Sequence, residues 1–120
     1  MMQTELRTLT LGLIPNGWQG LAFKPFREGI QIHRLYGEGR EGPAAAILKY
    51  EPGGMAPLHE HTGYEHILML DGSQEDEQGS YGPGAFVVNP PGSRHSVLSR
   101  EGCTALLIWE RPVRFIDGAG

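Results

Sequence analysis

Residues 53–99 read GGMAPLHEHTGYEHILMLDGSQEDEQGSYGPGAFVVNPPGSRHSVLS, and this stretch decides the fold. Its first half places three histidines and two glutamates between His59 and His66, directly before the apolar run ILML. Its second half places a further histidine, His95, after the turn sequence NPPGSR. Short apolar runs that alternate with glycine and proline are typical of β-strands joined by tight turns.

The rest of the chain follows the same pattern. Glycine and proline number 18 and 9 among 120 residues, nearly double their usual share of about 12%. They separate short β-type runs that include LTLGLI (9–14), IQIHRLY (30–36), AAAILKY (44–50) and TALLIWE (104–110). No apolar period of 3.6 lasts for ten residues, so the sequence predicts an all-β sandwich or barrel. We expect one domain over residues 1–120, with its N-terminal strands within about residues 1–36.

Charge and cysteine content exclude several classes of protein. The net charge of −4 comes without a basic run, which argues against nucleic acid and anionic membranes as partners. Cys103 is the only cysteine, so an internal disulfide framework is excluded and a reducing cytoplasm is favoured. We see no signal peptide and no transmembrane span. The composition therefore favours a cytoplasmic protein with neither nucleic acid nor a membrane as its partner.

The histidine cluster makes more sense on a strand than on a helix. On a helix, His59 and His61 would point about 200° apart. On a strand, positions 59, 61 and 65 share a face, because side chains alternate with a period of two. Two imidazoles and the Glu65 carboxylate would then meet on one side. A divalent metal ion would offset the cost of burying them, and His95, at the start of a later strand, is the candidate for a fourth ligand.

An HxH pair alone is weak evidence for a metal site, and exposure or incidental hydrogen bonding is the simpler interpretation. The surrounding spacing strengthens the metal interpretation. The first motif reads Gly53, five residues, His59, one residue, His61, three residues, Glu65, six residues, Gly72. The second reads Gly84, five residues, Pro90, one residue, Gly92, two residues, His95.

These spacings resemble the two motifs of the cupin superfamily, here over residues 53–72 and 84–99. The resemblance implies a small jelly-roll barrel, or double-stranded β-helix, whose two motifs form facing hairpins. It also implies that one divalent ion, of zinc, iron, manganese or nickel, is held by His59, His61, Glu65 and His95. Ser99 stands where the second motif usually ends in asparagine, a change that removes no ligand.

Residues 18–109 resemble more narrowly the cupin domain of the ChrR anti-sigma factor group, with DEQGSYGPG, NPPGSRH and EGC as the particular marks. That group commonly has a second glutamate where this chain has His66. ChrR itself captures its sigma factor with a separate helical, zinc-binding domain, for which these 120 residues have no room. We therefore do not expect an anti-sigma role.

The resemblance implies a small-molecule substrate or ligand as partner and leaves three interpretations of the function open. Four protein ligands leave two positions open on a six-coordinate ion, enough for a substrate oxygen beside dioxygen or water, or for a chelating substrate. Stand-alone relatives suggest a dioxygenase of diketones or hydroxylated aryl ketones. The alternatives are a metal or small-ligand sensor without catalysis, and a scaffold whose site is filled only incidentally. No residue is a persuasive general base, and we assign no catalytic residue.

Strand parity predicts which side chains surround the ion. Counted from Glu65 and His95, the inward-facing positions are Ile67, Met69, Val97 and Ser99. They line a mostly apolar pocket in one interpretation and fill the barrel as core in the other.

The remaining motifs have simpler interpretations. GEGREG (37–42) matches the GxGxxG consensus of dinucleotide-binding sites, but we expect it to be a hairpin loop. The acidic stretch DGSQEDEQG (71–79) lacks the pattern of a calcium-binding loop, and we expect it to be a solvated turn. His66, opposite in parity to Glu65, is expected to be exposed or to support a ligand. LRTLTLGLI (6–14) is a candidate edge strand for a homodimer. We expect His33 to be a structural strand histidine, and Cys103, Trp18 and Trp109 to be packing residues. Tyr64 and Tyr81 flank the site in the sequence, but nothing in the sequence places them at it.

Overall fold

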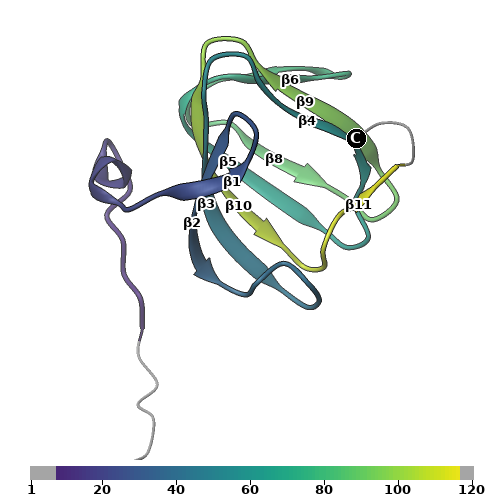
Figure 1. Ribbon diagram of the computed structural model, residues 1–120, viewed down its shortest axis with the longest axis horizontal. Coiled ribbons are helices and arrows are strands. Elements are labelled where there is room, and N and C mark those ends of the chain that lie inside the picture. Colours follow the sequence, from purple (N-terminus) through teal and green to yellow (C-terminus); the bar gives the residue numbers. More distant parts are fainter. Residues whose placement is uncertain (1–7, 117–120) are drawn as a thin grey trace, which may run out of the picture.

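The computed structural model describes residues 8–116, and almost all of its regular structure is β-strand (Figure 1). One sheet has six antiparallel strands; in sheet order they are β1 (Lys24–Arg27), β2 (Ile30–Tyr36), β3 (Ala44–Tyr50), β10 (Cys103–Trp109), β5 (Glu65–Gly72) and β8 (Phe86–Asn89). The other has five, in the order β11 (Arg114–Phe115), β4 (Gly54–Glu60), β9 (Arg94–Ser99), β6 (Gln74–Asp76) and β7 (Gly79–Tyr81). Within residues 8–116, no strand pairing joins the two sheets.

The two sheets face each other around a shared core, which confirms the prediction of an all-β jelly-roll barrel (Figure 1). Alternation along the strands decides which side chains reach this core. In β5 the buried positions are Glu65, Ile67 and Met69. In β9 every second residue, beginning with His95, is buried. The parity predicted for these two strands is therefore correct.

The histidine stretch is not one continuous strand, and that part of the sequence prediction is wrong. Strand β4 ends at Glu60 in the five-stranded sheet, and β5 begins at Glu65 in the six-stranded sheet. The intervening turn carries the chain from one sheet to the other. Glu65 therefore approaches the histidines from the opposite wall of the barrel, not by sharing a strand face with them.

The expected N-terminal strand at residues 9–14 is also absent from the structure. Leu9 to Leu13 have no regular structure, and a short 3₁₀ helix, η1 (Gly17–Gly20), follows. Figure 1 shows this segment leading away from the barrel, with Leu9 and Ile14 exposed. A strand needs a partner to satisfy its backbone groups, and this segment meets none. The first residues of the candidate edge strand 6–14 lie outside the described residues.

Glycines with positive φ angles allow the chain to turn between strands. The GEGREG sequence forms the loop between β2 and β3, with positive φ angles of 76°, 79° and 73° at Gly37, Gly39 and Gly42. Because a strand and not a helix follows it, the dinucleotide interpretation is excluded. None of the helices among residues 8–116 is long and apolar enough to span a membrane.

Candidate metal centre

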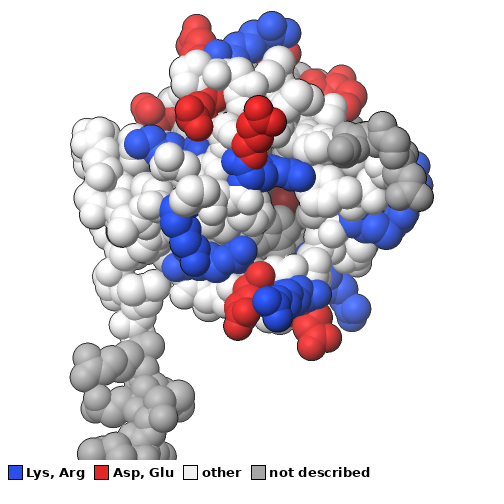
Figure 2. Space-filling view, in the orientation of Figure 1, with Lys and Arg blue, Asp and Glu red and all other residues white. Residues whose placement is uncertain are grey.

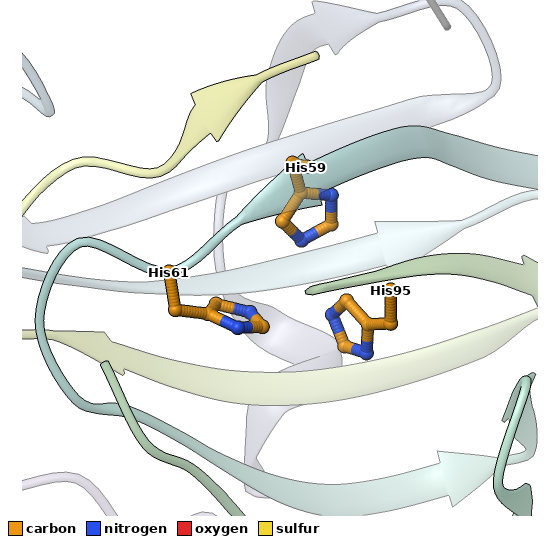
Figure 3. Close-up of side chains that lie close together, drawn as sticks. All are labelled: His59, His61 and His95. Atoms are coloured by element: carbon orange, nitrogen blue, oxygen red, sulfur yellow. The ribbon is translucent and has the colours of Figure 1, made fainter. Parts of the chain in front are cut away.

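Three histidines meet inside the barrel at one end of β4 and β9 (Figure 3). His59 lies opposite His95 in the register of these two strands, and His61 follows directly after β4. Each side chain offers one nitrogen within 4.8 Å of the other two. The three residues are only 5%, 1% and 6% exposed in chain order. Close, buried and convergent imidazoles are a donor set that several divalent metals accept.

Hydrogen bonds at the other ring nitrogen fix the tautomer of each histidine. His59 Nδ1 lies 2.7 Å from the carbonyl oxygen of Pro57, and His61 Nδ1 lies 3.1 Å from that of Ser93. His95 Nδ1 lies 3.0 Å from Oδ2 of Asp76. Carbonyl and carboxylate oxygens only accept hydrogen bonds, so each Nδ1 carries the proton. All three Nε2 atoms therefore keep their lone pairs, as a metal site requires.

Two of these lone pairs have no partner. Nε2 of His61 and Nε2 of His95 are buried and make no hydrogen bond with any described residue. Glu65 Oε1 lies 3.0 Å from Nε2 of His61 and 3.9 Å from Nε2 of His95. With the protons on Nδ1, acceptor faces acceptor across these gaps, which is repulsive unless a cation lies between them. The donor set therefore fits a divalent ion.

Glu65 is the predicted ligand that lies at the edge of this group. It is 3% exposed, and it is not one of the three residues whose donor atoms all lie within 4.8 Å of one another. Its Oε1 accepts a hydrogen bond of 3.0 Å from the side-chain amide of Asn89, and its Oε2 accepts one of 2.6 Å from the indole of Trp109. Trp109, expected only to pack, thus also orients the carboxylate.

Charge states at the site follow from burial and from the neighbours. Burial lowers the pKa of His59, which keeps its imidazole neutral and able to donate a lone pair. Burial raises the pKa of Glu65, but positive charge at the facing imidazoles, or on an ion held between them and the carboxylate, outweighs burial and holds this pKa below its usual value. A carboxylate beside neutral imidazoles is the charge state that binds a cation.

Asp76 belongs to the site, and the sequence interpretation missed it. The stretch 71–79 was expected to be a solvated turn, yet the Asp76 side chain is only 7% exposed. Besides holding His95, it accepts hydrogen bonds of 3.0 Å from the Tyr81 hydroxyl and 2.9 Å from the Gln78 backbone N–H. Burial raises the pKa of Asp76, but these bonds outweigh it and keep the pKa below its usual value. Tyr81 therefore acts on the site through Asp76.

A cavity of about 280 Å³ opens beside the histidines between the two sheets. His59, His95 and Glu65 border it at one end. Its walls are mostly apolar and include Leu48, Ile67, Val97, Leu107 and Trp109. Two of the four predicted pocket residues, Ile67 and Val97, thus line the cavity. The other two do not: Met69 is part of the core at 1% exposure, and the Ser99 hydroxyl donates to the carbonyl of Ser73.

The outer part of the cavity combines aromatic rings with charged side chains, among them Glu38. Phe26 and Phe115 border it and are 44% and 42% exposed. Arg27 stacks on the ring of Phe115 at 4.4 Å, and Phe115 in turn packs edge-on against His59. Arg34 also borders the cavity. Figure 2 shows a hollow in the middle of the face viewed, with both basic and acidic side chains around it.

The other histidines lie outside the site. His66 is stacked between Tyr64 and Phe86, away from the cavity. His33 Nδ1 lies 2.8 Å from the carbonyl of Ala22 and serves local structure. Cys103 is buried in the core, as expected.

Comparisons with known proteins agree with this geometry. A family model described as the ChrR cupin-like domain matches residues 18–112. Over 77 residues the chain is 35% identical to the anti-sigma-E factor ChrR of Cereibacter sphaeroides; the alignment covers 62% of this chain and 36% of that protein. The chain thus spans little more than a third of this curated relative.

Solved structures show the same fold. An acetylacetone dioxygenase from Acinetobacter johnsonii superposes with a TM-score of 0.76 at 17% identity, over 98% of this chain and 83% of that chain. The Rhodobacter sphaeroides complex of SigE with the anti-sigma ChrR gives a TM-score of 0.67 at 22% identity, over 76% of this chain and 50% of that chain. At these identities the likeness establishes the fold alone.

Proposed function

The chain belongs to the family of ChrR cupin-like domains, and from that premise we propose that it is a metal-dependent oxygenase of small oxygenated compounds such as diketones or hydroxylated aryl ketones. The observation that carries the proposal is the position of the three histidines. His59 and His95 line an apolar cavity, so an ion held by these two and His61 would face open space on that side. A structural ion is closed off by its ligands, whereas a working ion keeps positions open toward a cavity.

We assign the ligands as His59, His61 and His95, with Oε1 of Glu65 as the fourth donor. A carboxylate oxygen has two lone pairs, so Oε1 can accept the hydrogen bond from Asn89 and still face the ion. The ion would supply Lewis acidity and, if it is iron, electrons for dioxygen. The chain's own residues keep the imidazoles in one tautomer and hold the carboxylate ionised beside them.

The cavity supports a small and largely apolar substrate. Its volume of about 280 Å³ lies just below the usual range of ligand sites, which begins near 300 Å³. Apolar walls exclude water from the reacting group and leave the polar contacts to the histidine end. The fold shared with an acetylacetone dioxygenase is consistent with this substrate class.

Metal analysis and oxygen uptake test the proposal together. Purified protein should contain about one divalent ion per chain, and the protein loaded with iron(II) should consume oxygen with a diketone or a hydroxylated aryl ketone. His59→Ala and His95→Ala should abolish both properties. His33→Ala is the matched control, because His33 lies outside the site, and it should change neither. Protein that binds no metal in either form would refute the proposal.

A metal or small-ligand sensor is the second candidate function. The observation that favours it is the family itself, whose curated relative is an anti-sigma factor. Such a protein would bind its ligand beside the ion without turnover. Oxygen uptake separates the two functions: binding of the ketones to loaded protein without any oxygen consumption would identify the sensor.

We also propose that the chain forms a homodimer through its exposed apolar surface. Edge strand β8 carries Phe86 and Val88, which are 60% and 49% exposed, and the N-terminal segment carries the exposed Leu9 and Ile14. An edge strand with apolar side chains favours pairing with a second copy. Sedimentation equilibrium should give twice the chain mass, and a monomer at micromolar concentration would end the proposal.

A further inference from the structure

The end of the cavity opposite the histidines carries two polar side chains, Gln74 and Tyr50. Both are well buried, at 4% and 5% exposure. The amide nitrogen of Gln74 has no oxygen or nitrogen partner among the described residues; only the thiol of Cys103, a weak acceptor, lies beside it. A buried amide without a partner is costly, and natural proteins keep few of them. A polar group left in this state at a cavity wall is suited to a ligand.

Strand register places this polar end at a distance from the histidines. Strand β6 pairs with β9 where Glu75 faces Leu98, so Gln74 lies near Ser99, four residues along β9 from His95. Four residues of strand correspond to ~13 Å. Tyr50 pairs with Cys103, at the end of β10 opposite to the end where Trp109 pairs with Glu65. Gln74 and Tyr50 therefore lie together at the far end of the barrel.

The two side chains can both donate hydrogen bonds. Burial raises the pKa of Tyr50, and the charges of Cys103 beside it and of Glu65 from the other end of the cavity raise it further, so its hydroxyl keeps its proton at any physiological pH. The terminal torsion of a glutamine side chain is soft, so the amide of Gln74 can turn toward a ligand oxygen without moving its strand. Between this end and the histidines the wall is apolar, with Leu48, Val97 and others.

We propose that Gln74 and Tyr50 form a hydrogen-bonding end of the cavity that determines substrate specificity, by selecting compounds with a second oxygen at the far end of an apolar ring. This inference rests on the proposed function for the group bound at the histidines. It distinguishes between the two substrate classes named there. A short diketone would reach the histidines and leave both donors unpartnered, whereas an aryl ketone with a ring hydroxyl opposite its keto group would engage both ends.

The first test needs neither metal nor ligand. Methionine has nearly the shape of glutamine and no polar atom that must be satisfied, so Gln74→Met should melt at or above the temperature of the wild-type protein. Tyr50→Phe should likewise leave the melting temperature unchanged or higher. If both variants instead melt several degrees lower, the two groups have structural partners, and the proposal is overturned.

The second test measures ligand preference by calorimetry on zinc-loaded protein, which cannot turn over because zinc has no redox chemistry. The probes are an aryl ketone with a hydroxyl para to the keto group and the same ketone without it. Wild-type protein should bind the hydroxylated probe about tenfold more tightly, the effect of one net hydrogen bond. Gln74→Met should lose that preference. Gln31→Met, on β2 and outside the cavity, is the control and should keep it.

The outcomes separate the inference from the proposed function. If Gln74→Met loses the preference for the hydroxylated probe while the iron-loaded protein takes up no oxygen, the inference is supported and the oxygenase function is refuted. A preference that persists in Gln74→Met, or that is absent from the wild-type protein, would overturn the inference even if oxygen uptake were observed. If the protein does not bind zinc, the melting temperatures of Gln74→Met and Tyr50→Phe alone decide whether the inference stands.

Discussion

Asp76→Asn should weaken metal binding although Asp76 touches no metal in the proposed site. The aspartate accepts through both oxygens: Oδ2 from His95, and Oδ1 from the Gln78 N–H and the Tyr81 hydroxyl. Asparagine has one oxygen and one NH₂ group in their place. If its oxygen faces Gln78, its NH₂ faces Nδ1 of His95, and donor meets donor unless the histidine moves its proton to Nε2.

A proton on Nε2 of His95 removes the lone pair that the metal would use. The opposite orientation of the asparagine places its NH₂ against the Gln78 N–H, so either arrangement has a conflict. Loss of such a supporting carboxylate typically lowers metal affinity about 10- to 100-fold, which corresponds to about 1.4 to 2.8 kcal/mol. We therefore expect a zinc dissociation constant raised within that range, at unchanged stoichiometry.

Competition with a chromogenic chelator at constant pH measures this change directly. Asp71→Asn is the matched control, because Asp71 is an exposed residue of β5, and its affinity should equal that of the wild-type protein. Circular dichroism should confirm that both variants are folded. A folded Asp76→Asn protein whose zinc affinity differs from wild type by less than threefold would show that Asp76 does not set the tautomer of His95.

Three further predictions concern stability and reactivity. Trp109→Phe leaves the buried Glu65 carboxylate one hydrogen bond short and should lower the free energy of unfolding by about 1.5–3 kcal/mol; a loss below 0.5 kcal/mol in urea titration would contradict this. Gly72→Ala should prevent folding, because φ is +72° and the added Cβ would overlap backbone, whereas Gly92→Ala, with φ of +91° and open space, should cost only about 1–2 kcal/mol; equal losses would refute the steric argument. Burial raises the pKa of Cys103, so its thiol should resist Ellman's reagent at pH 8 until the protein is unfolded, and rapid reaction of folded protein would show that the thiol is accessible.

The sequence alone predicted the features that depend on the alternation of side chains along a single strand. Alternation in β5 and β9 correctly gave the inward direction of Ile67 and Val97. The spacing around His59 and His95 anticipated their meeting, although the strand argument that joined Glu65 to the histidines was wrong, because a turn between sheets separates them.

The sequence did not predict contacts between side chains that lie far apart along the chain. Asp76 is 19 residues from His95, and Trp109 is 44 residues from Glu65; each contact depends on how two sheets face each other, which no local pattern records. The run at 9–14 failed as a strand for a related reason, since an apolar β-type sequence pairs only where the fold offers it a neighbour.

The three histidines all belong to one wall of the barrel, on or directly after β4 and β9. Leu48, Ile67 and Leu107 line the cavity from the other wall, and no strand pairing among the described residues ties the walls together. A change in the spacing between the walls would therefore leave the distances among the three imidazoles unchanged. Of the four proposed ligands, only Glu65 approaches from the other wall. The distance between Glu65 and the ion is thus the one ligand distance that would change if filling the cavity altered the spacing of the walls.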